Sequence, residues 1–243
     1  MTTLVRITLA IILAFIVSSC GFDLNLGNFG TGEKGNGNVV EQTREITEEF
    51  TMVDASEGIE VYVTQGTDFD IAVEADENII DLIGTDIRNG KLKIHAIENI
   101  GRSTKKVYVT LPEVEGLFAS SGAHLTASSK ITADKLELDA SSGAVLNAEV
   151  LANRMDIDAS SGANIELSGS AEEVYVDGSS GSTVRAKDLM TKICNADASS
   201  GANVSIHVSD DLTADASSGG NISYKGEPNV KKNKSVSGSV HQY

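Results

Sequence analysis

The pentapeptide Asp139-Ala140-Ser141-Ser142-Gly143 recurs in closely similar form six times between residues 118 and 220. The repeats end in Gly122, Gly143, Gly162, Gly181, Gly201 and Gly219, which are 21, 19, 19, 20 and 18 residues apart. A period of about 20 residues with turn residues at one phase is typical of a stacked solenoid, in which each coil buries its apolar side against its neighbours. The sequence therefore predicts a repetitive fold.

Apolar and polar residues alternate on both sides of each glycine, as they do in strands that bury one face. Positions seven, five and three before the glycine and one, three and five after it are mostly small or aliphatic, so we expect them to face inward. Around Gly143 these positions are Leu136, Leu138, Ala140, Ala144, Leu146 and Ala148. Glycine can adopt positive φ at the corner between two strands. This pattern predicts a parallel β-helix with rungs about 4.8 Å apart.

Other solenoids fit the sequence less well. Leucine-rich repeats have a similar period, but the repeats here lack their leucine spacing and contain no ten-residue stretch of helical periodicity. A hexapeptide helix needs a six-residue period and calcium-binding nonapeptide repeats need nine, and neither period is present.

Residues 41–116 lack the Ser-Ser-Gly repeat, and their sequence predicts a β-rich cap. Alternating segments at 48–53, 58–65, 70–74, 91–96 and 105–111 indicate strands, and residues 76–83 could form a short helical turn. Asn89-Gly90 favours a tight hairpin. Because the open end of a β-helix would otherwise pair with another chain, an atypical first unit is expected there.

The first residues resemble a bacterial lipoprotein signal. Arg6 precedes an apolar run from Leu9 to Val17, which is too short for a stable membrane span, and small residues lead to Cys20. In such signals the cysteine becomes the lipidated N-terminus, so Cys20 is the expected lipid attachment site. An uncleaved anchor or a plain secretory signal is the alternative. Residues 20–40 are rich in Gly and Asn and predict a flexible tether.

Cys194 is the other cysteine, so no disulfide within the mature chain is expected. It occupies an inward column and is expected to be a buried small hydrophobe. The net charge of −16 argues against nucleic acid as a partner. The absence of Trp and an aromatic content of 5% weaken the case for carbohydrate binding.

Further stretches carry a resemblance to a known family. These are residues 58–66 (Gly-Ile-Glu-Val-Tyr-Val-Thr-Gln-Gly), 89–94 (Asn-Gly-Lys-Leu-Lys-Ile), 107–112 (Val-Tyr-Val-Thr-Leu-Pro), 50–53 and 75–78, together with the Ser-Gly repeats. They resemble the auto-transporter adhesin family called the head GIN domain, over roughly residues 46 to 240. The resemblance implies an exported Bacteroidetes-type lipoprotein with a right-handed β-helix similar to that of pectin lyases. It carries over no catalytic residues.

Five aspartates share one outward position, four residues before the corner glycine: Asp139, Asp158, Asp177, Asp197 and Asp215. Stacking would place them in one column. In water two charges about 5 Å apart repel by about 1 kcal/mol or less, which makes a divalent cation such as Ca²⁺ or a basic partner attractive. The competing interpretation, which we favour, is that each carboxylate accepts a hydrogen bond from a turn amide.

An enzyme is the other class to consider, because β-helical lyases and glycosidases place carboxylates on adjacent rungs. The four histidines are scattered and no repeat departs from the others, as a catalytic coil should. We therefore expect no catalytic site and no obligatory cofactor. The expected function is adhesion or interaction at the cell envelope, with a polysaccharide-active β-helix or a cation-binding envelope protein as alternatives.

The expected organisation has five parts. These are a signal peptide (1–19), a tether (20–40), a β-rich cap (41–116), the Ser-Ser-Gly solenoid (117–226) and a C-terminal strand or basic tail (227–243). We expect the lipid to hold the domain at the outer membrane. A surface polysaccharide or a protein is the expected partner, and the sequence leaves the oligomeric state open.

Overall fold

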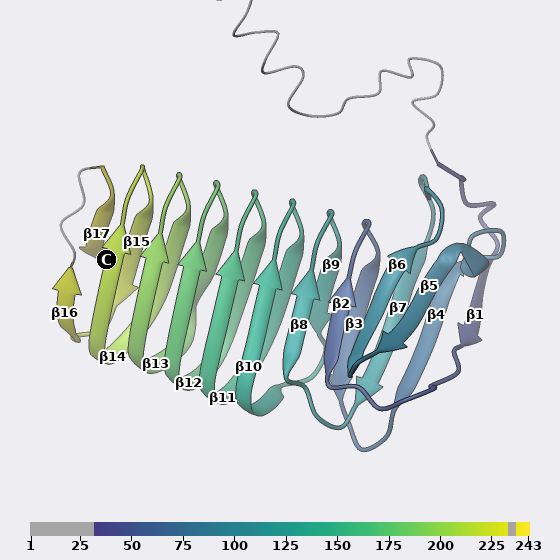
Figure 1. Cartoon of the computed structure of the whole chain (residues 1–243), viewed down its shortest axis with the longest axis horizontal. Helices are drawn as coiled ribbons and strands as arrows, with labels where there is room; N and C mark the ends of the chain where they lie inside the picture. The colour runs from purple at the N-terminus through teal and green to yellow at the C-terminus, as the bar shows by residue number, and fades with distance from the viewer. Residues whose placement is uncertain (1–31, 233–236) are drawn as a thin grey trace, which may run out of the picture. The chain divides into compact units, whose positions relative to one another are not determined.

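The computed structural model describes residues 32–232 and 237–243. Its strands form one sheet that winds into a β-solenoid, confirming the predicted fold class (Figure 1). The expected signal peptide and Cys20 lie outside the described residues. Among those that are described, no helix is long and apolar enough to cross a membrane.

The solenoid coils are built from strands that pair in parallel with the strands of the neighbouring coils. They are β8 (Gly116–Ala119), β9 (His124–Ala127), β10 (Ile131–Ala140), β11 (Val145–Ala159), β12 (Asn164–Gly178), β13 (Thr183–Ala198), β14 (Asn203–Ala216), β15 (Asn221–Lys225), β16 (Asn229–Lys232) and β17 (Ser239–Gln242). Strands β11 to β14 each leave one corner, pass round a bend and enter the next corner. In Figure 1 the corners form the upper tips of the coils.

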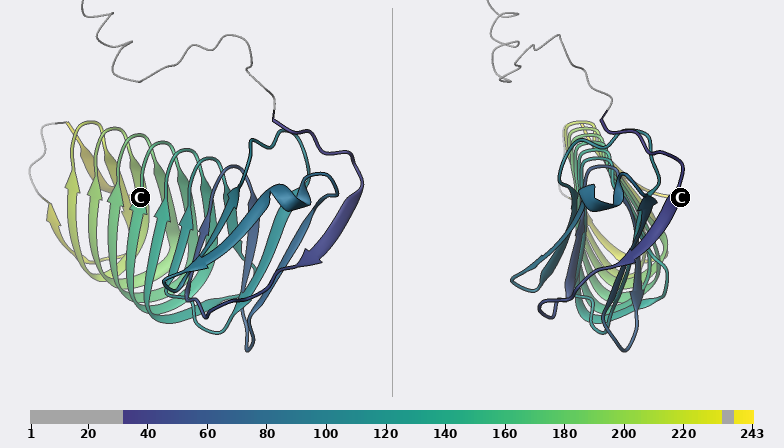
Figure 2. Two further views of the ribbon diagram at one scale, coloured as in Figure 1. Left: turned by 45° about the vertical axis from the view of Figure 1, so that its right-hand side comes forward. Right: turned by 90° about the vertical axis from the view of Figure 1, so that its right-hand side faces the viewer.

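The core is the stack of inward columns that the alternation predicts. Leu136, Leu138 and Leu146 are fully buried, and Met155 and Ile157 continue two of these columns on the next coil. Seen along the axis, the coils superpose as a narrow loop with two long sides (Figure 2). Because inward and outward residues alternate, the two long sides each bury one set of side chains and expose the other.

Cys194 lies in this core with no exposed surface and forms no disulfide, as expected. Burial raises the pKa of its thiol to about 12. The thiolate, which is the reactive form, is therefore almost absent at neutral pH.

Each corner is a two-residue turn with both central residues in the left-handed region. Ser142 has φ 52° and Gly143 has φ 73°, which defines a type I′ turn, and the other five corners repeat this pair. Ala144 N–H donates to Ser141 O (3.0 Å) within the turn, and Gly143 N–H donates to Ser161 O of the next coil (3.1 Å). The sequence predicted positive φ for the glycine, whereas the serine before it adopts positive φ as well.

The N-terminal part contains a further solenoid coil that the Ser-Ser-Gly repeat pattern did not predict. Strands β2 (Met52–Ala55) and β3 (Glu60–Gln65) flank a corner at Glu57 (φ 60°) and Gly58 (φ 66°). This coil pairs in parallel with β8 and β9 on one side. On the other side it pairs in parallel with β6 (Lys91–Ala96) and β7 (Lys105–Leu111). The coils therefore stack out of chain order, with β2–β3 between β6–β7 and β8–β9.

Antiparallel strands cover the end of the solenoid beyond β7, where the sequence predicted a cap. β4 (Asp70–Asp76) pairs with β7 and β1 (Val39–Thr43) pairs with β4, while β5 (Ile83–Arg88) forms a hairpin with β6. Asn89 and Gly90 turn this hairpin with positive φ, as predicted. The short helical segment is a 3₁₀ turn, η1 (Ile80–Leu82). Strands β1 and β5 were not expected, because their sequences alternate only weakly.

The corner geometry generates a stability prediction. Ser161 is exposed and left-handed (φ 52°), so a β-branched residue there meets the steric cost of that conformation, about 1–2 kcal/mol, with no loss of core packing. We expect Ser161→Val to lower the thermal midpoint and Ser161→Asn to preserve or raise it, since Asn tolerates this region. Ser160→Val, at the preceding position without positive φ, is the matched control. Equal midpoints for the two valine variants would contradict the prediction.

Candidate functional site

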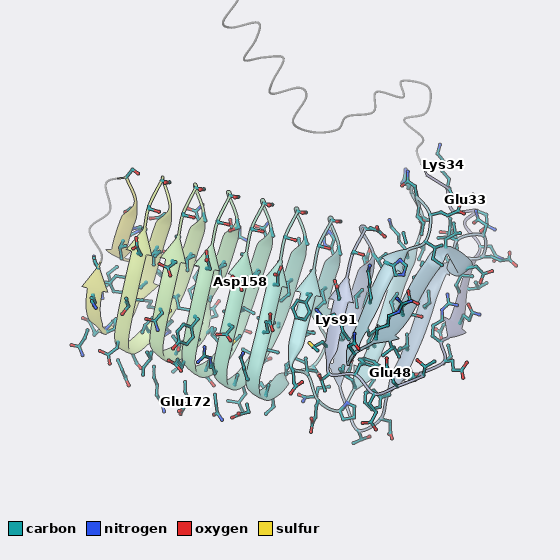
Figure 3. All side chains as sticks on the ribbon, viewed as in Figure 1. Glu33, Lys34, Glu48, Lys91, Asp158 and Glu172 are labelled. Atoms are coloured by element: carbon teal, nitrogen blue, oxygen red, sulfur yellow. The ribbon has the colours of Figure 1, made fainter. Side chains whose placement is uncertain are left out.

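The five predicted aspartates lie side by side in register on one long side of the solenoid. Asp139 pairs with Asp158, Asp158 with Asp177, Asp177 with Asp197 and Asp197 with Asp215. A second outward row runs beside them, formed by Glu137, Asp156, Tyr175, Asn195 and Thr213. We call these two rows the acidic face. Asp158 is labelled within it in Figure 3.

The aspartate row continues into the N-terminal part through Phe118, which occupies the same position in the first repeat, and through Asp54, which the sequence did not connect with it. Asp139 is in register with Phe118, and Phe118 with Asp54 of β2. The ammonium group of Lys91 lies 3.7 Å from the centre of the Phe118 ring, a cation–π contact. The row therefore has an aromatic and a basic residue at its N-terminal end.

Asp139, Asp158, Asp177 and Asp197 do not accept hydrogen bonds from the turn amides, as the sequence had suggested they would. The amide that an Asx turn at Asp139 would use belongs to Ser141, and it donates instead to Ala119 O of the preceding coil (2.9 Å). Equivalent bonds run from Ser160 to Ala140 and from Ser179 to Ala159. Within the described residues, the carboxylates of Asp139, Asp158, Asp177 and Asp197 have no hydrogen bond or ion pair. Backbone hydrogen bonds between coils satisfy the turn amides that the carboxylates were expected to bind.

Partial burial and neighbouring carboxylates disfavour ionisation of three members of this row, Asp139, Asp158 and Asp197. Burial, together with the charges of Asp177 and Asp139, raises the pKa of Asp158. Burial and the charges of Asp215 and Asp177 raise the pKa of Asp197 in the same way. The row therefore stores unfavourable electrostatic energy at neutral pH.

Asp156, two residues before Asp158, has the opposite environment. Its carboxylate receives Lys135 Nζ (3.0 Å) and Arg154 Nη2 (3.2 Å), and Arg154 also lies over the Tyr175 ring at 4.3 Å. Burial opposes ionisation of Asp156, but the two hydrogen bonds outweigh it and lower its pKa. Lys135 and Arg154 thus pair with Asp156 in the second row and not with the neighbouring Asp158 or Asp177.

A shallow depression of about 380 Å³ lies over the acidic face, between Lys135 and Asp197, with Tyr175 in its lining. Among residues 32–232 and 237–243, no group of three or more His, Cys, Asp or Glu side chains is arranged to hold a metal ion. The geometry favours long-range attraction of a positively charged group over coordination of one ion at a defined point.

A larger groove of about 650 Å³ follows the bend between the two long sides, across β10 to β14. Alanines form part of its floor (Ala133, Ala152 and Ala171), and two large apolar side chains rise from it, Leu151 (48% exposed) and Met190 (61% exposed). Glu172, which is labelled at the lower edge of Figure 3, belongs to its rim. Contiguous exposed apolar surface of this kind often marks an interaction site.

The other long side presents a different chemistry, which we call the polar face. Its outward residues follow the corners by two or four positions and are mostly amides and hydroxyls: Thr126, Asn147, Asn164, Thr183, Asn203, Ser205, Asn221 and Ser223. Glu166 and Arg185, which have opposite charges, are in register with each other, and the Arg185 guanidinium donates to Asn164 Oδ1 (3.4 Å).

The row of Thr126 ends in two stacked tyrosines that sequence reasoning missed. Tyr62 of β3 is in register with Thr126 on one side and with Tyr108 of β7 on the other. The two ring centres are 5.2 Å apart and the planes differ by 17°. The repeated tetrapeptide Val-Tyr-Val-Thr at 61–64 and 107–110 was a usable signal, since equal segments of a solenoid pair with each other.

Comparison with known proteins agrees with this architecture. Residues 49–228 match the family model described as "putative auto-transporter adhesin, head GIN domain". This chain belongs to the head GIN domain family. The match covers the coils from β2 to β15 and so includes the acidic face, the groove and the tyrosine pair. No curated protein matches the chain.

Solved structures share the fold of this head GIN domain. A putative adhesin from Bacteroides fragilis superposes with a TM-score of 0.78 at 17% identity, covering 87% of this chain and 100% of that one. A putative adhesin from Parabacteroides merdae gives 0.69 at 21% identity, covering 87% and 98%. A putative lipid binding protein from Parabacteroides distasonis gives 0.63 at 17%, covering 87% and 99%.

The contrast between Asp158 and Asp156 predicts opposite effects of the same substitution. We expect Asp158→Asn to raise the thermal midpoint of the head GIN domain at pH 7, because it removes repulsion of less than about 1 kcal/mol per neighbour. Asp156→Asn should lower it, because Lys135 and Arg154 lose their partner.

The pH dependence of these two variants provides the check. A raised pKa in the folded state contributes stability that is present in acid and is lost as pH rises through the folded pKa, whereas a lowered pKa has the reverse effect. The advantage of Asp158→Asn should therefore disappear in acid, below the normal carboxyl pKa. The penalty of Asp156→Asn should also disappear as pH falls through its lowered pKa. A destabilised Asp158→Asn at pH 7 would contradict this account.

Proposed function

We propose that this head GIN domain is a non-catalytic adhesion or interaction module that displays a repetitive β-solenoid surface at the cell envelope. The observation that carries the proposal is the register of the outward residues. The same type of side chain recurs at the same height on successive coils, with carboxylates from Asp139 to Asp215 on one face and amides or hydroxyls from Asn164 to Asn221 on the other. Such a surface offers many equal, shallow contacts, which suits multivalent attachment.

Membership in a family described as adhesins supports this proposal. The chemistry of the acidic face supports it over a polysaccharide-active enzyme. The carboxylates of Asp158 and Asp177 have equivalents on the neighbouring coils, whereas a catalytic pair is normally a local exception to a regular fold. Lys135, which lines the same depression, and Arg154 both pair with Asp156.

Within this role, we propose that the acidic face contacts basic groups of a partner, with divalent cations such as Ca²⁺ as weak competitors for the same charge. The raised pKa values of Asp139, Asp158 and Asp197 support attraction of positive charge, because a nearby cation would relieve the repulsion within the row.

We also propose that the chain is a lipoprotein held at the outer membrane through Cys20. The support comes from the sequence: Arg6, a short apolar run and small residues before the cysteine are typical of a lipoprotein signal. A Gly-rich segment between Cys20 and β1 would separate the module from the membrane surface.

The adhesion proposal is tested with beads coated with the purified full-length chain, under flow, over immobilised polysaccharides and extracellular proteins. We expect retention above that of albumin-coated beads on at least one surface. The variant Asp158→Asn/Asp177→Asn/Asp197→Asn should lose the part of the retention that falls as salt rises. The control Glu48→Gln/Glu98→Gln/Glu113→Gln removes the same charge at exposed positions elsewhere and should behave as wild type. Beads retained on no surface would refute the adhesion role.

Anchoring is tested separately by substitution of Cys20 in the producing cell. We expect wild-type chain in the outer-membrane fraction, with a fatty-acid label, and Cys20→Ala in soluble fractions without the label. Cys194→Ala is the matched control, because Cys194 is buried and should not affect fractionation. An unlabelled wild-type chain would refute the lipoprotein proposal.

A further inference from the structure

The stacked pair Tyr62 and Tyr108 forms a rigid aromatic platform on the N-terminal coils. The Tyr62 hydroxyl donates to Glu60 Oε2 (3.1 Å) and the Tyr108 hydroxyl to Glu74 Oε2 (3.4 Å), so both rings are held at their outer ends. Lys106 Nζ pairs with the second oxygen of Glu74 at 3.0 Å and fixes that carboxylate. Little rotamer freedom remains for a ligand to remove on binding.

One face of the platform is open because the neighbouring strand carries small residues. Tyr62 covers one face of the Tyr108 ring. On the other side of Tyr108 the residues in register are Ala72 of β4 and, beyond it, Thr43 of β1. These side chains are much shorter than a phenol, so the surface beside the Tyr108 ring lies lower than the ring. We call this lower surface at Ala72 and Thr43 the step. Tyr108 is 37% exposed, one of the large apolar side chains left uncovered.

The step has a polar rim on both sides. Glu74 and Lys106 are in register with each other along one side, and Asp70 and Thr110 along the other. A flat ring above small residues, bordered by donors and acceptors, is the arrangement that suits a pyranose. The C–H groups on one face of a sugar ring pack on an aromatic face, and its hydroxyls need both donors and acceptors.

The adjoining surface selects for an uncharged ligand. From Tyr62 the row continues into Thr126 and Asn147 of the polar face, whose members are mostly amides and hydroxyls. Carboxylates at Glu60, Glu74 and Asp70 surround the platform and repel an anionic glycan, as does the net charge of −16.

We propose that Tyr108 and Tyr62, with the step at Ala72 and the adjoining Thr126 and Asn147, form a binding site for a neutral saccharide. The inference rests on the proposed adhesion role and deepens it by naming a ligand class and a place. Tyr108 provides the stacking surface. Tyr62 supports it from behind, and the polar face extends the site along the solenoid for further sugar units.

Binding is measured by calorimetry and tyrosine fluorescence with the full-length chain, which contains five Tyr and no Trp. The probes are cellohexaose, xylohexaose and mannohexaose, with hexagalacturonate as an acidic and a chitosan hexamer as a basic comparison. We expect at least one neutral hexamer to bind and to change the tyrosine emission, and hexagalacturonate not to bind. Tyr108→Ala should weaken binding at least tenfold, whereas Tyr108→Phe should retain most of it because stacking needs only the ring.

Tyr175→Ala is the matched control, because Tyr175 is an outward tyrosine of the acidic face. The affinity of this variant for the neutral hexamer should equal that of wild type. Circular dichroism and thermal midpoints of all variants verify folding. Binding by no neutral hexamer, equal affinity of wild type and Tyr108→Ala, or preference for the acidic or basic hexamer would each overturn the inference. Bead retention that persists in Tyr108→Ala, without saccharide binding by wild type, would overturn the inference alone and leave the adhesion role standing.

Discussion

The structure depends on the left-handed Ser-Gly pair at each corner of the solenoid. A type I′ turn reverses the chain within two residues, and the carbonyl of its left-handed serine accepts a hydrogen bond from the glycine amide of the coil before. The turn thereby satisfies backbone groups both within a coil and between coils. Every coil must then enter and leave the corner at the same height, so the outward side chains next to the corners fall into register, whereas the register shifts at the bend.

Register turns a repeated sequence into rows of equal side chains, and the rows on the two long sides differ. Aspartates that follow one another at the coil spacing accumulate repulsion, whereas amides and hydroxyls at the same spacing do not. We therefore expect the acidic face to attract basic groups from a distance and the polar face to offer close hydrogen bonding. One backbone geometry thus presents two chemically distinct surfaces, separated by the core and by the apolar groove at the bend.

The N-terminal part extends the same solenoid. The coil of β2 and β3 has its own left-handed corner at Glu57 and Gly58, but its neighbours along the stack come from distant parts of the sequence. This out-of-order stacking brings Tyr62 against Tyr108, 46 residues later in the chain. The antiparallel strands β4 and β1 then cover the end of the stack, and their small side chains leave one face of Tyr108 open.

The sequence by itself determined the coil period, the inward columns, the corner glycines, the aspartate row and the Asn89-Gly90 hairpin, because each depends on local alternation or turn chemistry. The tertiary structure alone decided the left-handed serine at each corner and the stacking order of the first coils. It also decided which carboxylates pair with a cation. Asp156 and Asp158 look alike in sequence, yet only Asp156 lies within reach of Lys135 on the neighbouring coil. The tertiary structure also decided the tyrosine pair, because the stacking of the coils sets which distant segments become neighbours.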